Sequence, residues 1–251
     1  MYNIVNFSGG RSSAYMVNIL KATDKECIYI FCNTSKETPE TYKFIEQCDK
    51  FFKMNLVILE YKPKGFTITN INDCKKNGEI FEELIEYKKF IPNVAMRFCT
   101  IDMKIAVTKR YLKSLGIKKY INYLGIRADE PQRYSKIISR NNKNIYNDMP
   151  LFYNEITKEI VNSYWKKQSF DLGHSSALGN CDLCFLKGKN KLINILREQP
   201  DKAKWWIEQE NKSGHTFKKD ISYNEMLLLS KRPEFNFEEE TEIICNCNNN
   251  D

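Results

Sequence analysis

The feature that most constrains this chain is an apolar stretch near the N-terminus, followed at once by a glycine turn and a helical segment. Residues 4–7 predict a short buried strand, Ser8-Gly9-Gly10 interrupts it, and residues 14–20 have the composition of a helix. Glycine lets backbone N–H groups approach a ligand closely, and a helix N-terminus favours negative charge. This arrangement therefore predicts an anion-binding turn.

Side chains of the same turn add hydrogen-bond donors that suit a phosphate. The candidate ligands are Ser8, Gly9, Gly10, Arg11, Ser12 and Ser13. The segment lacks both the GxxxxGK[ST] pattern of a P-loop and the third glycine of a dinucleotide fingerprint. On these residues alone, an ordinary turn between a strand and a helix is an equal alternative.

The length of 251 residues fits one domain, or one domain with a C-terminal subdomain. We expect no membrane partner, because no apolar run reaches about 18 residues. The start of the chain does not resemble a signal peptide, so a cytoplasmic protein is expected. Nine cysteines then favour thiols, a metal site or redox chemistry over a disulfide framework. The net charge of +7 permits nucleic-acid binding, but its dispersed lysines favour a solvated surface.

Three further apolar runs, at residues 27–33, 56–61 and 120–124, predict strands separated by helices. Such alternation predicts an α/β fold with a doubly wound, mostly parallel sheet, whose ligands gather where the strands end. The polar pair Asn33-Thr34 follows one of these strands, so it shares a rim with the Ser8 turn. Residues 135–148 are rich in Asn, Lys and Ser and predict an exposed loop.

The loop after the strand at 120–124 carries two arginines and two acids, namely Arg127, Arg133, Asp129 and Glu130. Arginine at a strand end suits a polyanion, and an acid can hold Mg²⁺ beside a phosphate. The alternative is a solvated loop with an exposed ion pair, which contributes little to stability.

The turn, which reads SGGRSS, resembles the SGG-x-x-S pyrophosphate loop of the adenine-nucleotide alpha-hydrolase superfamily. Residues 33–41 resemble a segment of the sulfate-nucleotide reductases, with Thr34 matching and Asn33 in place of an acid. Residues 125–133 resemble a third segment of that family. The chain is therefore similar to the phosphoadenylyl-sulfate (PAPS) reductase-like family, which implies an adenine-nucleotide alpha-hydrolase core with a helical C-terminal part.

The best metal-ligand signal is the pair Cys181 and Cys184, spaced as in half of a zinc site. Residues 97–105 resemble the Cys-Cys-x-x-Arg-Lys region of adenylyl-sulfate reductases, with Cys99 and Lys104 matching. That resemblance implies a [4Fe–4S] cluster on Cys99, Cys181 and Cys184. Zinc on the same three thiolates, with water or His174, and three plainly packed thiols stay open as alternatives.

The attacking cysteine of the family's C-terminal Glu-Cys-Gly-[Ile/Leu]-His segment has no counterpart here. Cys245 or Cys247 is the candidate substitute, although neighbouring acids disfavour the thiolate. We expect a nucleotide-binding domain at residues 1–187, a helical extension at 188–242 and a flexible tail at 243–251.

The resemblance implies an enzyme that binds ATP, adenylyl-sulfate or PAPS and carries out sulfur chemistry with a sulfur donor or thiol reductant. The candidate catalytic residues are Lys104, Arg127, Arg133, Cys245 and Cys247. Two alternatives stay open. One is ATP-dependent adenylation and thiolation of a nucleic-acid base, and the other is a non-catalytic nucleotide- or nucleic-acid-binding module.

Overall fold

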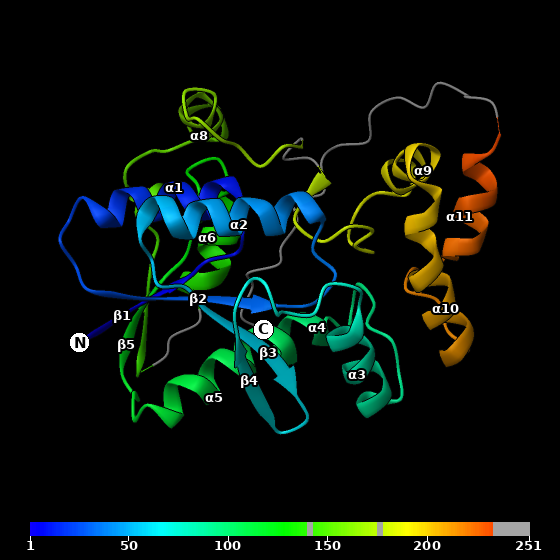
Figure 1. The fold of residues 1–251 in the computed structure, drawn as a ribbon, viewed down its shortest axis with the longest axis horizontal. Helices are drawn as coiled ribbons and strands as arrows, with labels where there is room; N and C mark the ends of the chain where they lie inside the picture. The colour runs from blue at the N-terminus through cyan, green and yellow to red at the C-terminus, as the bar shows by residue number, and fades with distance from the viewer. Residues whose placement is uncertain (140–142, 175–177, 233–251) are drawn as a thin grey trace.

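A six-stranded sheet in the order β4-β3-β2-β1-β5-β6 forms the centre of the computed structural model, which describes residues 1–139, 143–174 and 178–232 (Figure 1). Its strands are β1 (Tyr2–Asn6), β2 (Cys27–Asn33), β3 (Val57–Lys62), β4 (Gly65–Thr69), β5 (Tyr120–Tyr123) and β6 (Ile145–Asp148). Neighbouring strands are parallel except β3 and β4, which form an antiparallel pair. The predicted α/β fold is confirmed.

Helices lie on both faces of the sheet. In Figure 1, α1 (Arg11–Lys21) and α2 (Pro39–Phe52) lie above it, and α3 (Glu79–Lys88), α4 (Phe98–Thr100) and α5 (Val107–Ser114) lie below it. A π-helical segment, η1 (Ile101–Ala106), joins α4 to α5. The remaining helices of the first two thirds are α6 (Pro131–Ile138), α7 (Pro150–Tyr153) and α8 (Lys158–Trp165).

Successive side chains of a strand point to opposite faces of the sheet, so each central strand contributes residues to two apolar layers. On β1, Val5 packs in the layer that contains Phe44 of α2. Its neighbour Ile4 packs in the other layer, with Leu112 of α5. Both strand residues are fully buried, so β1 lies between the two cores.

The C-terminal helical part contains α9 (Lys189–Glu198), the 3₁₀ turn η3 (Pro200–Lys202), α10 (Ala203–Ser213) and α11 (Tyr223–Ser230). Figure 1 shows it to one side of the sheet, beyond α3. Phe81 of α3 packs against Trp205, with ring centroids 5.3 Å apart, and Lys212 pairs with Glu82 at 2.6 Å. The division into domains at residue 187 stays a prediction. None of the helices within the described ranges is long and apolar enough to cross a membrane.

One part of the sequence-based interpretation was wrong, and one strand was not predicted. Residues 135–148 were expected to be an exposed loop, but they contain the end of α6 and the edge strand β6. Residues 65–69, for which the sequence predicted no strand, form β4. In both cases a short strand at the edge of the sheet carries too few apolar residues to be distinguished from a loop.

The order of the strands creates a switch point beside β1. From β1 the chain first adds β2 and β3 on one side, and it later adds β5 and β6 on the other. The loops that follow β1 and β5 therefore leave the sheet next to each other at their carboxyl ends, where open α/β sheets form their ligand crevice.

Candidate nucleotide-binding site

The turn after β1 requires glycine in its first glycine position. Gly9 has φ +77°, in the left-handed region. A Cβ there would also lie 2.9 Å from Ile45 Cδ1 and 3.1 Å from Thr41 Cγ2 of α2. Gly9 thus lets the turn bend against α2, so that α1 begins at Arg11 with its first backbone N–H groups facing the end of β1.

Hydroxyl groups hold the turn together from inside. Ser13 Oγ donates to Gly10 O at 2.9 Å, and Ser8 Oγ lies 3.0 Å from Ser13 Oγ. Ser13 is buried, so its hydroxyl is used within the turn. Ser12 Oγ instead accepts a hydrogen bond from Arg127 Nη1 at 3.1 Å.

The Arg11 side chain binds a segment that lies much later in the chain. Its Nε and Nη2 each lie 2.6 Å from one oxygen of the Asp171 carboxylate, and its Nη1 donates to His174 O at 2.9 Å. Burial alone would raise the pKa of Asp171, but the hydrogen bond from Arg11, the Leu172 N–H and the Arg11 charge outweigh it and lower that pKa. The structure thus places the predicted phosphate ligand Arg11 in an ion pair.

The loop after β5 packs against the start of α1. Gly125 permits this, because a Cβ there would lie 3.1 Å from Ser13 Cα and 3.2 Å from Ser13 N. Beyond it, Arg127 binds both Asp129 oxygens at 2.9 and 3.1 Å while also reaching Ser12. The predicted loop of arginines and acids therefore lies beside the glycine turn.

Glu130 organises that loop from within. Its side chain is 1% exposed, accepts a hydrogen bond from Arg127 N at 3.0 Å and pairs with Arg133 Nη1. Arg133 Nε is buried and has no hydrogen-bond partner among the described residues. Arg133 thus retains a donor that the described part of the protein leaves unsatisfied.

Asn33 and Thr34 form a buried network at the end of β2. Asn33 Nδ2 donates to Glu60 Oε1 at 2.7 Å, and Asn33 Oδ1 accepts from Tyr42 Oη at 2.8 Å. Thr34 Oγ1 donates to Glu37 Oε1 at 2.7 Å. Both predicted ligands therefore use their side chains to shape the loop.

A cavity opens next to the turn, between the carboxyl ends of the central strands and the segment η1–α5. Its lining includes Asn6, Ser8, Cys32, Lys104 and Asn122. Thr108 also lines it, and its Oγ1 lies 3.2 Å from Cys32 Sγ. Lys104 was predicted from sequence. The asparagines and Cys32 were missed, since a single polar residue inside an apolar strand does not indicate what it faces.

The segment at Asn180-Cys181-Asp182 runs along the loop after β2 like a short added strand. Thr38 N donates to Asn180 O at 3.0 Å, and Asp182 N donates to Lys36 O at 2.9 Å. The Asn180 side chain continues to the glycine turn, where its Nδ2 donates to Ser8 O at 2.6 Å. The segment Asn180-Cys181-Asp182, called the cysteine loop below, is thereby attached to the glycine turn.

The metal prediction does not fit this geometry. Within residues 1–139, 143–174 and 178–232, no three His, Cys, Asp or Glu side chains are grouped closely enough to hold a metal ion. Cys99, Cys181 and Cys184 are consequently not assembled as ligands of a [4Fe–4S] cluster or of zinc. A Mg²⁺ ion at the acids near Arg127 stays a prediction, because Mg²⁺ beside a phosphate needs only one or two carboxylates. Cys245 and Cys247 lie outside the described residues.

A mostly parallel sheet, with a glycine–serine turn and an arginine loop at the switch point, defines an α/β protein whose candidate ligand site lies at the ends of β1 and β5. The chain belongs to the phosphoadenosine phosphosulfate reductase domain family, whose model matches residues 2–172.

Two relatives carry names that give no activity. The chain is 32% identical over 205 residues to "Uncharacterized nin region protein ORF290" of Escherichia phage lambda, covering 76% of this chain and 68% of that protein. It is 24% identical over 216 residues to "Uncharacterized protein MJ0066" of Methanocaldococcus jannaschii, covering 83% of this chain and 40% of that protein. Among solved structures, a PAPS reductase from Candida auris in a phosphate complex matches 66% of this chain and 71% of its own, with 18% identity and a TM-score of 0.39.

Proposed function

We propose that the protein is an enzyme that binds an adenine nucleotide at the switch point of the sheet and carries out sulfur-related chemistry of the PAPS reductase kind. The phosphates would lie on the turn Ser8–Ser13, and the base would enter the cavity lined by Asn6 and Lys104. The observation that carries the proposal is that Ser8 belongs to both the turn and the cavity. One nucleotide can therefore occupy the two together.

Hydrogen-bond donors at the site support an anionic ligand. Ser12 and Arg127 lie together at the start of α1, and the buried Nε of Arg133 has no hydrogen-bond partner among the described residues. Backbone N–H groups at the helix N-terminus add to this attraction. These groups suit a phosphate or a phosphosulfate, both of which accept several hydrogen bonds.

For the reductase activity, a dithiol reductant would supply two electrons to the sulfate group of PAPS or adenylyl-sulfate. The bond between that sulfur and the phosphate oxygen breaks, sulfite and the nucleotide leave, and the dithiol becomes a disulfide. The chain's own groups would bind the nucleotide and neutralise its charge. Among them, Lys104 and Arg127 are the proposed cations nearest to the cavity and the turn.

Calorimetric titration of the full chain with ATP, adenylyl-sulfate and PAPS tests binding. Ser12→Ala removes the hydroxyl that meets Arg127, and we expect it to weaken binding about tenfold, as the loss of one charge-assisted hydrogen bond implies. The control is Ser139→Ala, whose hydroxyl bonds Lys136 O in an exposed position. If none of the three nucleotides binds the wild-type protein, the proposed function is wrong.

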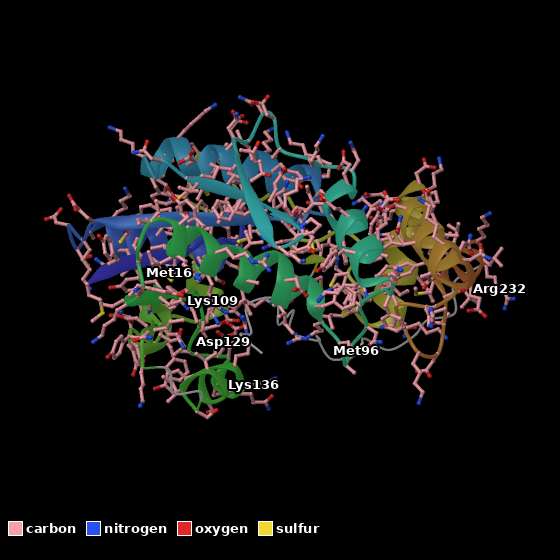
Figure 2. All side chains as sticks on the ribbon, turned by 90° about the horizontal axis from the view of Figure 1, so that it is seen from below. Met16, Met96, Lys109, Asp129, Lys136 and Arg232 are labelled. Carbon is pink, nitrogen blue, oxygen red and sulfur yellow. The ribbon has the colours of Figure 1, made fainter. Side chains whose placement is uncertain are left out.

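A second candidate function is supported by a segregation of charge. Residues 103–128 contain seven Lys or Arg and no Asp or Glu. Figure 2 shows Lys109 of α5 and Lys136 of α6 at the same end of the molecule, away from Arg232. Basic surface next to a nucleotide site suits a nucleic-acid substrate.

In that reaction a carbonyl oxygen of a base would attack the α-phosphate of ATP and release pyrophosphate. A sulfur donor would then displace AMP from the activated base. Sulfite release from PAPS or adenylyl-sulfate with a dithiol supports the first function. Pyrophosphate release from ATP that depends on added RNA supports the second. A protein that binds nucleotide but does neither is the non-catalytic module.

A further inference from the structure

Three asparagines form a ladder of amide groups across neighbouring strands. Asn6 lies at the end of β1, Asn122 on β5 and Asn147 on β6, where Asn122 and Asn147 are direct partners in the register. Asn6 Nδ2 donates to Asn122 Oδ1, and Asn122 Nδ2 donates to Asn147 Oδ1 at 2.8 Å. Asn122 is 4% exposed, so the centre of the ladder is buried.

The ladder has a direction. Each amide group offers an NH₂ donor and a carbonyl acceptor, and both hydrogen bonds run from β1 towards β6. Reversing one amide would place two donors or two acceptors against each other, so the three orientations are coupled. With Asn122 satisfied at both ends, the Asn6 carbonyl oxygen is the ladder group that accepts no hydrogen bond within the described residues.

That oxygen belongs to a residue that lines the cavity beside the glycine turn. Most other polar side chains of the lining are cations or are already paired, and the Tyr120 hydroxyl is a further polar group there that can both donate and accept. Lys104 and Lys109 are donors, and the Thr108 hydroxyl lies against Cys32. Asn6 therefore contributes a hydrogen-bond acceptor whose orientation is coupled through Asn122, which also lines the cavity, to Asn147, which does not.

We propose that Asn6, oriented by Asn122 and Asn147, selects a 6-aminopurine over a 6-oxopurine in this cavity. The proposal rests on the proposed function, since it assumes that the base of the nucleotide enters there. An amino group at position 6 donates to an acceptor, whereas an oxo group at the same position places a second acceptor against it. An unpaired acceptor in a desolvated site discriminates strongly against the wrong ligand.

ATP and ITP provide the test, because their phosphates are identical, while their bases differ in the amino or oxo group at position 6 and in the proton that the oxo form carries on N1. We expect the wild-type protein to bind ATP at least about tenfold more tightly than ITP in calorimetric titrations of the full chain. Asn6→Leu should bring the two affinities within about twofold of each other, while phosphate-dependent binding persists.

Variants of Asn147 and Asn3 distinguish the positioning of the Asn6 amide from a general effect on the sheet. Asn147→Ala leaves the cavity wall intact but releases the Asn122 amide, so the ratio between ATP and ITP should fall. Asn3→Ala is the matched control on β1, where the side chain bonds Glu26 O at the other end of the strand. Its ratio should equal that of the wild-type protein. Thermal unfolding confirms that each variant is folded.

Two results would overturn the inference and leave the proposed function standing. One is equal affinity of the wild-type protein for ATP and ITP, and the other is an unchanged preference in Asn6→Leu. Failure of the wild-type protein to bind either nucleotide would overturn the proposed function together with this inference.

Discussion

Arg11 and Asp171 form a bidentate ion pair, in which the arginine Nε lies 2.6 Å from Asp171 Oδ1 and Nη2 lies 2.6 Å from Oδ2. The pair joins the first turn of α1 to a segment 160 residues later in the chain. This fork geometry is the strongest form of an arginine–carboxylate contact. The arginine of the SGGRSS turn is therefore engaged within the protein, where the sequence had suggested a phosphate ligand.

The pair gives stability a defined pH dependence. The pKa of Asp171 is lowered in the folded protein, so its contribution is present above the unfolded value of about 3.9 and is lost as the pH falls through the folded value. We expect Asp171→Asn to lower the urea midpoint at pH 7, and this difference from the wild-type protein should shrink below about pH 4. Exposed Asp24→Asn is the control. A difference that persists unchanged at pH 3 would contradict the ion-pair explanation.

Gly125 sets how closely the arginine loop approaches the glycine turn at residues 8–13. Gly125→Ala would place a methyl group 3.1 Å from Ser13 Cα, and backbone atoms cannot move aside cheaply. We expect a loss of about 1–3 kcal/mol in the free energy of unfolding, as in other overpacked sites, and weaker nucleotide binding. Gly65→Ala is the matched control, because its nearest neighbour would be 3.8 Å away. Equal losses in the two variants would show that the close approach is unimportant.

Cys32 should be an unreactive thiol at neutral pH. Burial raises its pKa to about 11, and the hydrogen bond with Thr108 offsets this only in part. Because the thiolate is the reactive form, we expect alkylation at pH 8 to be much slower than at half-buried Cys27 and to accelerate as the pH approaches 11. Mass spectrometry after timed alkylation measures both sites. Rapid labelling of Cys32 at pH 7 in the folded protein would refute this.

Lys36 attaches the loop after β2 to the cysteine loop and the C-terminal helices. Its Nζ lies 3.1 Å from Asp182 Oδ2 and 4.7 Å from the centre of the Trp205 ring. The side chains of Lys36 and Asp182 are 9% and 11% exposed, so removing one charge leaves the other buried. We expect Lys36→Met to cost about 3–5 kcal/mol in urea unfolding followed by tryptophan fluorescence.

The control for this variant is Lys204→Met, whose pair with Asp201 is exposed and should contribute about 0–1 kcal/mol. A cost at Lys36 no greater than at Lys204 would mean that the buried Lys36–Asp182 pair stabilises the protein no more than an exposed ion pair does.

The central strands could be predicted because their physical signal is local. Residues 27–33 are a continuous apolar run, and Pro39 marks the first turn of α2 where a missing N–H does no harm. The edge strands β4 and β6 were missed for the opposite reason. β4 pairs with β3, and β6 pairs with β5. These hydrogen bonds to a neighbouring strand stabilise the extended conformation, which the residues of β4 and β6 do not indicate by themselves.

Within the candidate site, the glycine turn and the arginine loop were predictable because both are contiguous in sequence. The partners of these residues were not. Asp171 neutralises Arg11 across 160 positions, and Asn122 meets Asn6 across 116. The sequence spacing of Cys99, Cys181 and Cys184 resembled a set of metal ligands, but the structure does not group these side chains as one. Spacing along the chain therefore does not determine which side chains meet in the fold.

The side-chain amide of Asn180 donates a hydrogen bond to the backbone carbonyl of Ser8, which lies 172 residues earlier in the chain. During synthesis, the glycine turn would therefore leave the ribosome long before Asn180, the residue that binds its Ser8 carbonyl. The last position matched by the family model is residue 172, which precedes Asn180. A fragment that ends at residue 172 would contain the whole glycine turn but would lack the hydrogen bond from Asn180. We therefore expect nucleotide affinity only after the cysteine loop has folded against the sheet.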